Sequence, residues 1–341
     1  DISLVNTNGV ELTRLNKNYF YEYTNETKNF LSSLLYEDLN VILKRKKYLD
    51  EVITNEHYKA LQNLDIINDC ELIGFHGQTI VHRPEIKLSI QLGDPKLLAN
   101  LLNKDVVFDF RSKDIELGGQ GAPLAPIYHK FIIQNLKLDL PSCILNIGGV
   151  SNITYWDGNN LIGFDTGPGN ALMDTYMKKK FNKYFDKNGN KASKGNIHID
   201  TVTDFLRNNF FNQQPPKSLD RNSFINAYED LLNKKLLPSD TMATLAEFTV
   251  QSIVKALHFL PKPIKNIIIT GGGYQNNYLM KRLIETLNIN FIFENDINFN
   301  FIESELIAFL SARTLYELPL TYPSTTGVSK VTSGGKVYNY L

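Results

Sequence analysis

A single carboxylate, Asp165, lies within the glycine-rich stretch 163–170. A hydrophobic run precedes this stretch, a helical pattern comes after it, and three glycines and Pro168 surround the carboxylate. Glycine adopts backbone conformations that other residues avoid, and proline fixes its own φ, so such a loop can hold an aspartate rigidly beside a ligand. A carboxylate held in this way can act as a general base. The same pattern is also compatible with an ordinary tight turn.

Two further glycine-rich turns, 148–149 and 271–273, each follow a hydrophobic run typical of a buried strand. Backbone N–H groups in such turns can point at an anion, and a helix expected after Gly273 would add its positive end. Neither turn has the spacing of a Walker loop or a complete dinucleotide fingerprint. Each turn alone is weak support, but together, with Asp165 between them in the sequence, they favour a nucleotide phosphate site.

The elements that must position these residues are strands alternating with helices. Hairpins are predicted near the start of the chain and again over 144–164, which a purely parallel sheet would not give. The pattern therefore favours an α/β protein with a mixed sheet in each of two lobes, 1–140 and 141–341, with an approximate boundary. Ligands in such folds bind where loops converge at strand ends. The sequence also predicts helices over 27–43, 95–102 and 171–181 and a strand over 266–270. A loop is expected over 186–196 and an irregular tail from 318.

Composition limits the function classes. Lys plus Arg and Asp plus Glu both number 36, so the formal net charge is zero and nothing global indicates nucleic acid or an acidic membrane. Cys70 and Cys143, both in apolar settings, indicate neither a disulfide framework nor a metal site, and a cytoplasmic location is expected. No apolar run approaches the roughly 20 residues of a membrane span. The histidines show no clustering, so no protein-bound metal is predicted.

Eight short motifs occur in the order in which one protein family carries them. They are 76–79, 91–94, 109–111, 118–123, 146–149, 164–170, 215–218 and 271–273. With these motifs the sequence resembles the anhydro-N-acetylmuramic acid kinases of the sugar kinase, Hsp70 and actin superfamily. The resemblance extends from Asp1 to about Gly327. It implies a two-lobed actin-like ATPase (ribonuclease H-like) fold with mixed sheets flanked by helices, and a homodimer.

The resemblance also implies a reaction in peptidoglycan recycling and amino-sugar metabolism. Water opens the ring of 1,6-anhydro-N-acetylmuramic acid, and O6 takes the γ-phosphate of ATP, giving N-acetylmuramic acid 6-phosphate and ADP. The family's catalytic aspartate falls on Asp165. One carboxylate can suffice, because the departing O6 attacks phosphorus instead of needing a proton from a second acid. Magnesium is expected to arrive with ATP, since phosphoryl transfer requires charge neutralisation.

The remaining predicted site residues divide between the two substrates. The predicted ATP-binding residues are Asn146, Gly148, Gly149, Gly167, Gly169, Asn170, Gly271, Gly272 and Gly273. The predicted sugar-binding residues are Arg111, His76, Gln120, Gly121 and Glu305. The resemblance places Arg111 in the sugar site, where a guanidinium could bind the lactyl carboxylate bidentately.

Each sugar-binding prediction has a structural alternative. Arg111 could form a surface ion pair, and His76 could be a hydrogen-bonded core histidine. Gln120 and Gly121 either shape the sugar pocket or turn the chain, and Glu305 either lines a cleft or is an acid at a helix N-terminus. Lys217 in the Pro-Pro-Lys-Ser motif is equally compatible with a structural role.

One departure from the family pattern concerns the start of the chain. Family members begin with a strand and a Ser-Gly-Thr-Ser-Leu-Asp-Gly loop that wraps the ATP phosphates, and residues 1–5 resemble the segment immediately after that loop. The first strand and phosphate loop are therefore expected to be absent from this chain. Such a loss would remove hydrogen-bond donors to the transferred phosphoryl group. A non-catalytic sugar- or nucleotide-binding homologue, or a kinase for another sugar, are the alternative functions.

Overall fold

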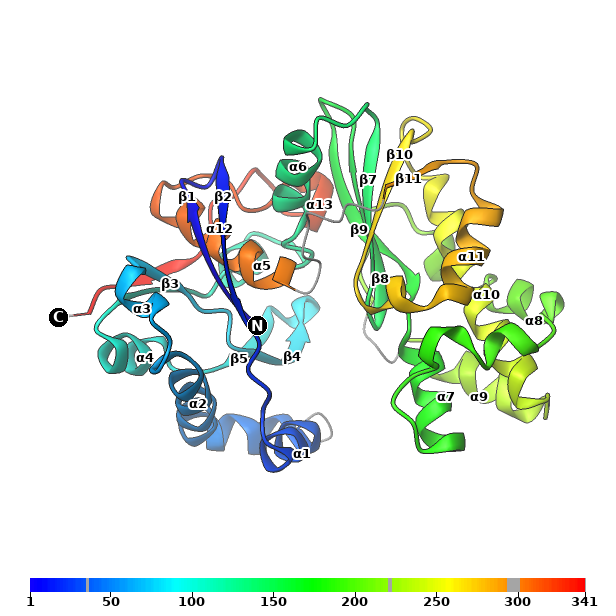
Figure 1. Ribbon diagram of the computed structural model, residues 1–341, viewed down its shortest axis with the longest axis horizontal. Helices are drawn as coiled ribbons and strands as arrows, with labels where there is room; N and C mark the ends of the chain where they lie inside the picture. The colour runs from blue at the N-terminus through cyan, green and yellow to red at the C-terminus, as the bar shows by residue number, and fades with distance from the viewer. Residues whose placement is uncertain (35–36, 220–222, 293–300, 341) are drawn as a thin grey trace. The chain divides into compact units, whose positions relative to one another are not determined.

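The computed structural model describes residues 1–34, 37–219, 223–292 and 301–340. The chain forms two compact units: unit 1 comprises Asp1–Tyr128 and Asn300–Leu341, and unit 2 comprises His129–Phe299 (Figure 1). These bounds differ from the expected lobes 1–140 and 141–341. The difference arises because helix α12 (Ile302–Leu315) and strand β12 (Lys336–Tyr338) pack with strands from the N-terminal part of the chain.

Unit 2 is built on a mixed sheet, which has five strands in the part of the chain that the structure describes. Its strands are β7 (Ser142–Ile147), β8 (Val150–Trp156), β9 (Leu161–Pro168), β10 (Asn266–Thr270) and β11 (Asn290–Ile292). The strand order is β11-β10-β7-β8-β9; β7, β8 and β9 are antiparallel neighbours, whereas β10 runs parallel to β7 and to β11. The predicted hairpin over 144–164 and the strand at 266–270 are confirmed.

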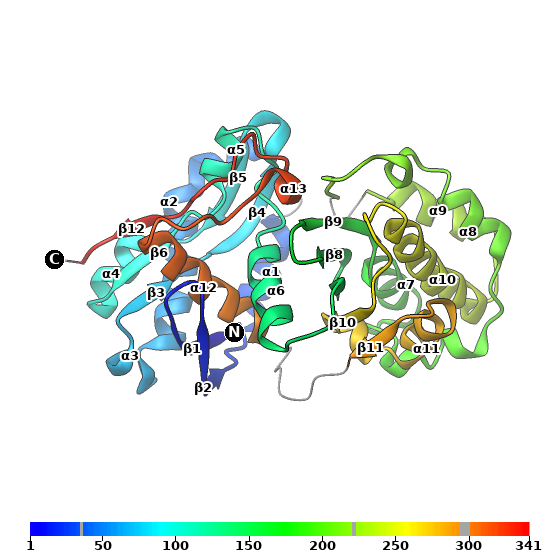
Figure 2. The same ribbon diagram turned by 90° about the horizontal axis from the view of Figure 1, so that it is seen from above.

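Helices and short 3-10 turns complete unit 2. They are α7 (Ala171–Phe181), η2 (Lys187–Gly189), η3 (Ala192–Lys194), α8 (Ile199–Phe205), η4 (Asn209–Asn212), α9 (Ile225–Asn233), α10 (Pro238–Leu257), η5 (Gly272–Gln275) and α11 (Asn277–Thr286). Figure 2 shows α7, α10 and α11 on one side of the sheet. On the other face, His129 Nδ1 of α6 (Pro126–Asn135) lies 2.8 Å from Thr154 Oγ1.

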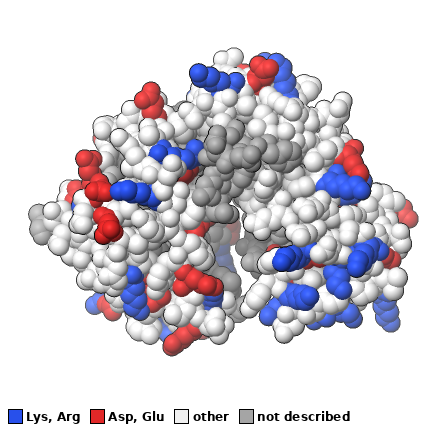
Figure 3. All heavy atoms as spheres, in the orientation of Figure 1, with Lys and Arg blue, Asp and Glu red and all other residues white. Residues whose placement is uncertain are grey.

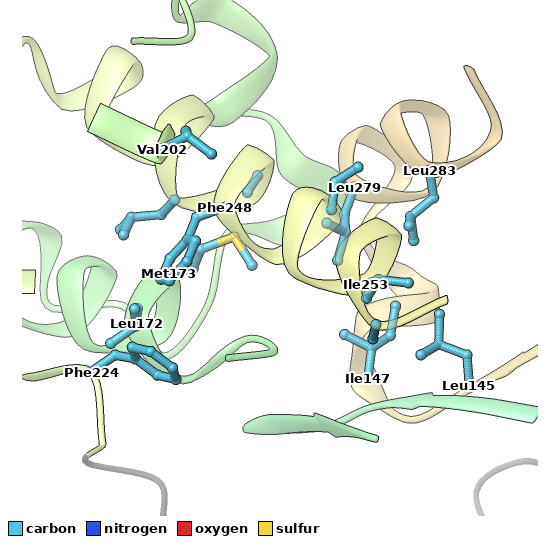
Figure 4. Packing of buried hydrophobic residues seen from close by; sticks show 14 of the residues in the cluster. Leu145, Ile147, Leu172, Met173, Val202, Phe224, Phe248, Ile253, Leu279 and Leu283 are labelled. Atoms are coloured by element: carbon cyan, nitrogen blue, oxygen red, sulfur yellow. The ribbon is translucent and has the colours of Figure 1, made fainter. Parts of the chain in front are cut away.

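The core of unit 2 centres on α10, which is apolar around much of its circumference. Phe248 and Ile253 of α10 are both fully buried. In Figure 4 Ile253 lies near Leu145 of β7 and Leu279 of α11, whereas Phe248 packs against Phe205 of α8 with ring centres 5.0 Å apart. All of them belong to one hydrophobic cluster. Burying a large apolar side chain contributes roughly 1.5–3 kcal/mol, so this helix fixes the sheet that carries Asp165.

The described residues of unit 1 form three small sheets. Their strands are β1 (Ile2–Thr7), β2 (Leu12–Tyr19), β3 (Leu72–Gly74), β4 (Gln78–Arg83), β5 (Leu88–Leu92), β6 (Asp105–Phe108) and β12 (Lys336–Tyr338). β1 pairs antiparallel with β2, and β4 with β5, while the order β12-β6-β3 makes a mixed sheet. The predicted α/β class, with mixed sheets flanked by helices, is confirmed.

The helices of unit 1 cover these sheets. They are α1 (Asn25–Leu34), α2 (Leu39–Leu61), α3 (Ile66–Asp69), η1 (Pro84–Ile86), α4 (Pro95–Leu102), α5 (Ser112–Glu116), α12 (Ile302–Leu315) and α13 (Pro323–Thr326). α12 lies so close to β3 that a Cβ on Gly74 would stand 2.4 Å from Ser311 Oγ. This close approach explains why α12 belongs to unit 1.

Three local predictions were wrong. The range 27–43, expected to be one helix, contains most of α1 and the start of a second helix, α2. α2 begins at Leu39 because the Asp38 side chain accepts a hydrogen bond from the N–H of Asn40. The expected loop over 186–196 contains two 3-10 turns, in which buried Asp186 accepts from the N–H groups of Lys191 and Ala192. The tail expected to be irregular includes β12, which pairs with β6.

Two surface observations complete the description. None of the helices among the described residues is long and apolar enough to span a membrane. On the face shown in Figure 3, acidic and basic side chains are mixed over unit 1, and basic ones are more frequent over the helices of unit 2. The last turn of α7, for example, carries Lys178, Lys179 and Lys180.

Candidate active site

The predicted ATP-binding residues of unit 2 come together at the ends of β7, β9 and β10. The N–H groups of Gly169 and Asn170 donate to the carbonyls of Gly149 (2.9 Å) and Gly148 (2.7 Å). The Asn170 amide also donates to Ile147 O at 3.1 Å. The turn after β7 and the turn after β9 are thus hydrogen-bonded to each other, although some 20 residues separate them in the sequence.

The third glycine turn packs against the same point. Gly271 has φ +80°, and a Cβ there would lie 2.4 Å from Asn146 Oδ1. A Cβ on Gly273 would lie 2.4 Å from Cγ2 of Ile147. Gly272, in contrast, is exposed, and a Cβ there would meet nothing closer than Asn170 Nδ2 at 3.8 Å. Two glycines therefore allow close packing, and the third leaves the turn accessible to a ligand.

The helix that follows this turn does not contribute as expected. A 3-10 turn, η5, comes directly after Gly271, and α11 begins only at Asn277. The Asn276 side chain already accepts a hydrogen bond from the N–H of Leu279 at 3.1 Å. The helix that begins at the glycine cluster is instead α7, which starts immediately after Asn170, and the Asn170 side chain does not cap its N-terminus. Its positive end favours an anion at this position.

Asp165 lies in β9, four residues before Gly169, and is mostly buried. Its Oδ2 accepts a hydrogen bond from the N–H of Leu219 at 2.7 Å, and its own N–H donates to Lys217 O at 3.0 Å. Among the described residues no Lys or Arg forms an ion pair with this carboxylate. Burial raises the pKa of Asp165 to about 7, and the hydrogen bond from Leu219 opposes that rise.

A carboxyl group with this pKa is suited to accept a proton near neutral pH. A general base is most effective when its pKa lies close to the working pH. Oδ1 of Asp165 accepts no hydrogen bond from the described residues, which leaves this oxygen for a water molecule. The local geometry therefore supports the predicted role as a base on chemical grounds alone.

In unit 1, Arg111 and His76 form a pair. Arg111 Nε and Nη2 lie 3.2 and 3.0 Å from His76 Nε2, and Nη1 donates to Gly121 O at 2.6 Å. His76 Nε2 is therefore the acceptor, and Nδ1 carries the proton, facing Gly77 O at 3.2 Å. Burial, assisted by the Arg111 charge, lowers the pKa of His76 to about 4, so this histidine is neutral at pH 7.

Arg111 is the charged partner in this pair, and its charge is not balanced by a direct ion pair. Burial lowers the pKa of Arg111 to about 10, which still leaves it protonated at neutral pH. No carboxylate of the described residues lies within 4.0 Å of its guanidinium. A guanidinium has five N–H groups, so Nη1 and Nη2 each retain one for a ligand. The alternative of a surface ion pair is not observed, and an anionic ligand would balance the charge.

The loop that holds Arg111 depends on Asp114, a residue that sequence reasoning missed. Asp114 is 2% exposed; its Oδ1 accepts from the N–H of Gly121 at 2.6 Å and its Oδ2 from Thr326 Oγ1 at 2.6 Å. Gln120 donates its N–H to Thr326 O at 2.8 Å. Gly119 has no room for a side chain beside Asp114. The sequence does contain a signal for Asp114: an acidic residue that lies three positions after Arg111 and just before a glycine-rich loop.

Glu305 lies in a different setting from Arg111 and His76. It is 1% exposed, and Arg14 Nε and Nη2 donate to its two carboxylate oxygens, each at 2.7 Å. The Tyr128 hydroxyl also donates to Oε2 at 2.6 Å. Both oxygens therefore have protein partners, so these contacts favour a structural role over sugar binding. Of the predicted sugar-binding residues, Arg111, His76, Gln120 and Gly121 are neighbours and Glu305 belongs to a separate network.

Comparisons with known proteins agree with the resemblance in the sequence. The family model described as "Anhydro-N-acetylmuramic acid kinase" matches residues 1–340. Curated proteins of that name include one from Rhodopseudomonas palustris, 38% identical, with 98% of this chain and 94% of the relative covered. Others come from Nitrobacter winogradskyi (37%; 99% and 95% covered) and Zymomonas mobilis (36%; 99% and 95% covered).

Solved structures give weaker matches. An activator of 2-hydroxyisocaproyl-CoA dehydratase from Clostridium difficile is 15% identical over 53% of this chain and 63% of its own, with a TM-score of 0.34. A xylulose kinase from Lactobacillus acidophilus is 14% identical over 58% of this chain and 42% of its own, with a TM-score of 0.33. TM-scores this low support no statement about this chain.

The family match and the near-complete coverage by relatives classify the chain as a phosphotransferase of the kinase class. More specifically, it belongs to the anhydro-N-acetylmuramic acid kinase family.

Proposed function

We propose that this chain uses ATP and water to convert 1,6-anhydro-N-acetylmuramic acid into N-acetylmuramic acid 6-phosphate and ADP, as part of cell-wall recycling. The observation that carries the proposal is Asp165, a mostly buried carboxyl group whose pKa is raised to about 7 within a hydrogen-bonded glycine cluster. Family membership supplies the substrate and the reaction type.

The proposed step balances with one carboxylate. Water attacks C1 of the sugar and gives a proton to Asp165 Oδ1 while the bond between C1 and O6 breaks. O6 attacks the γ-phosphorus of ATP, and the bond from that phosphorus to the bridging oxygen breaks, releasing ADP. Asp165 later returns its proton to water. Because O6 leaves as a nucleophile for phosphorus, no second carboxylic acid is required.

The other predicted residues have separate roles in this proposal. In unit 2 the exposed backbone around Gly149 and Gly272, together with the N-terminus of α7, would bind the ATP phosphates. In unit 1 Arg111 would bind the lactyl carboxylate of the sugar, with His76 fixing the orientation of its guanidinium. Magnesium is part of the ATP substrate in this scheme, since charge on the transferred phosphoryl group must be neutralised.

The test is sugar-dependent ADP release by the wild-type chain and by Asp165→Asn. We expect turnover only with both ATP and the anhydro sugar, and a loss of kcat on the order of 100-fold or more in the variant. The matched control is Asp204→Asn, because Asp204 is an exposed aspartate of the same unit that pairs with Arg207. Equal turnover in Asp165→Asn and wild type would reject the mechanism.

Two related predictions accompany this function. The alternative of a non-catalytic homologue predicts saturable sugar binding by calorimetry without ADP release, and the names of the relatives do not favour it.

We also propose a cytoplasmic homodimer, as the resemblance implies. Sedimentation equilibrium of the purified chain over a range of concentrations tests the dimer, and a single monomeric mass would contradict it.

A further inference from the structure

The Pro-Pro-Lys-Ser motif at 215–218 lies directly beside Asp165. Among the described residues β9 is an edge strand of the unit 2 sheet, so its outer hydrogen-bonding groups need partners from elsewhere. Lys217 O accepts from the Asp165 N–H at 3.0 Å, and the Leu219 N–H donates to Asp165 Oδ2 at 2.7 Å. Residues 217 and 219 therefore hold both the backbone and the carboxylate of Asp165.

The inner edge of β9 is irregular at the same position. Its pairing with β8 goes from Asn152 opposite Asp165 to Ser151 opposite Gly167, so Thr166 is an extra residue on β9. Such bulges alter the local direction of a strand and commonly occur beside active sites. Because the ladder to β8 is interrupted here, the orientation of the Asp165 side chain depends strongly on residues 217–219.

The Lys217 side chain is buried in an unusual setting. It is 5% exposed, and among the described residues no carboxylate lies within ion-pair distance of its ammonium group. Nζ donates to Phe210 O at 3.0 Å. The ammonium group lies 4.3 Å from the ring centre of Phe259, 4.5 Å from that of Phe210 and 5.8 Å from that of Phe164.

We call these three rings the aromatic cage. Phe164 immediately precedes Asp165 in β9, and Phe259 follows the C-terminus of α10. A cation over aromatic faces is stabilised by the negative charge density of the rings, most strongly when water is excluded, and the carbonyl adds a charge-assisted hydrogen bond. Burial lowers the pKa of Lys217 to about 8, with Lys255 adding to the effect, so the side chain is mostly protonated at neutral pH.

Lys217 does not pair directly with Asp165. Burial raises the pKa of Asp165, and the hydrogen bond from Leu219 opposes that rise. The two side chains form no ion pair. The connection between them runs through the backbone of residues 217–219.

We infer that Lys217 is a positioning residue for Asp165. Its ammonium group, held by the aromatic cage and Phe210 O, fixes the segment whose carbonyl and N–H hold Asp165 in place. This inference rests on the proposed function, in which Asp165 is the base. A base displaced by about 1 Å can lose on the order of 100-fold in rate.

The test compares Lys217→Met with Lys255→Met. Methionine keeps an unbranched apolar side chain as far as the Cε position and removes the charged donor Nζ. Lys255 is the matched control, because it also donates to a backbone carbonyl of unit 2, Leu206 O at 3.2 Å, without holding Asp165. We expect Lys217→Met to lose about 10- to 100-fold in kcat with little change in the KM for ATP, and Lys255→Met to stay within about threefold of wild type.

The pH profile separates positioning from a merely structural role. When the Leu219 N–H no longer stabilises the carboxylate, the pKa of Asp165 should rise, so the acid limb of the kcat profile should move to higher pH. Lys217→Arg should restore part of the rate, since arginine also donates to carbonyls and stacks on rings. An unchanged kcat, or a lower kcat with the acid limb unmoved, would overturn the inference.

A second variant covers the case in which Lys217→Met does not fold. Phe259→Leu removes one ring of the aromatic cage and leaves residues 217–219 intact. It should lower kcat and move the acid limb in the same direction by a smaller amount, whereas an unmoved limb would count against positioning.

Asp165→Asn, measured in parallel, keeps the two proposals apart. If Asp165→Asn is inactive while Lys217→Met behaves as wild type, only the positioning role fails; if Asp165→Asn is fully active, the proposed function fails.

Discussion

The backbone N–H of Leu219 donates a hydrogen bond to Oδ2 of Asp165 at 2.7 Å across 54 residues of sequence. This contact is the principal stabilising interaction of a carboxylate that burial otherwise destabilises. It leaves Oδ1 for water and links the base to a segment outside its own strand. The balance between burial and this hydrogen bond governs the pH behaviour expected of the protein.

The first prediction concerns the pH dependence of activity. A base must be ionised, so kcat/KM for the anhydro sugar should rise with pH and level off above an apparent pKa near 7. The measurement is sugar-dependent ADP release at saturating ATP in buffers of constant ionic strength. An acid limb with an apparent pKa near 4, typical of an exposed carboxylate, would show that Asp165 is not the titrating group.

The second prediction concerns stability. The pKa of Asp165 is about 7 in the folded protein and 3.8 in its ordinary state, so the folded protein retains a proton that the unfolded chain releases between these values. Raising the pH through this window therefore lowers the free energy of unfolding. Asn does not titrate and can still accept from Leu219. Asp165→Asn should thus melt at a higher temperature than wild type near pH 8, with the difference shrinking near pH 4; a difference independent of pH would contradict this reasoning.

The third prediction concerns Arg111. Arg111→Ala should raise the KM for the anhydro sugar by about 10- to 100-fold, the effect of losing a charge-assisted hydrogen-bond pair, and leave the KM for ATP unchanged. Lys113→Ala is the control, because Lys113 is an exposed basic residue two positions away that contacts Ser333. An analogue that lacks the lactyl carboxylate should bind wild type and Arg111→Ala equally. If the variant weakens both ligands alike, Arg111 does not bind the carboxylate.

The fourth prediction compares two adjacent glycines. Gly271→Ala places a Cβ 2.4 Å from Asn146 Oδ1 at φ +80°, so it should destabilise unit 2 by on the order of 1–3 kcal/mol. Gly272→Ala meets nothing closer than 3.8 Å and should leave the melting temperature nearly unchanged. Because Gly272 is exposed in the proposed phosphate site, its substitution should raise the KM for ATP. Normal ATP kinetics in Gly272→Ala would remove this turn from the site.

The fifth prediction concerns Glu305. Its carboxylate binds Arg14 and Tyr128, so Glu305→Gln should lower the free energy of unfolding by about 1–3 kcal/mol. The KM for the sugar should stay within about twofold of wild type, provided that assays are run well below the melting temperature. Chemical denaturation measures the free energy of unfolding, and steady-state kinetics measures the KM for the sugar. A large rise in the sugar KM with unchanged stability would instead support the sugar-binding role predicted from the sequence.

Local patterns in the sequence were enough to predict the elements around the site. The helices 95–102 and 171–181 and the strand 266–270 begin and end where they were predicted, because apolar periodicity, prolines and glycines are properties of neighbouring residues. The same patterns located Asp165, Arg111 and the glycine turns. They misplaced the start of α2, where one side-chain cap at Asp38 decides the boundary.

The sequence by itself therefore determined the family, the α/β class and the residue types of the site. Only the tertiary structure decided the partners that give those residues their chemistry: Leu219 for Asp165, His76 for Arg111, and Arg14 for Glu305. These partners are 54, 35 and 291 residues apart in the chain. No local period or turn preference specifies contacts at such separations. They follow from the packing of whole elements, which also sets the burial that shifts each pKa.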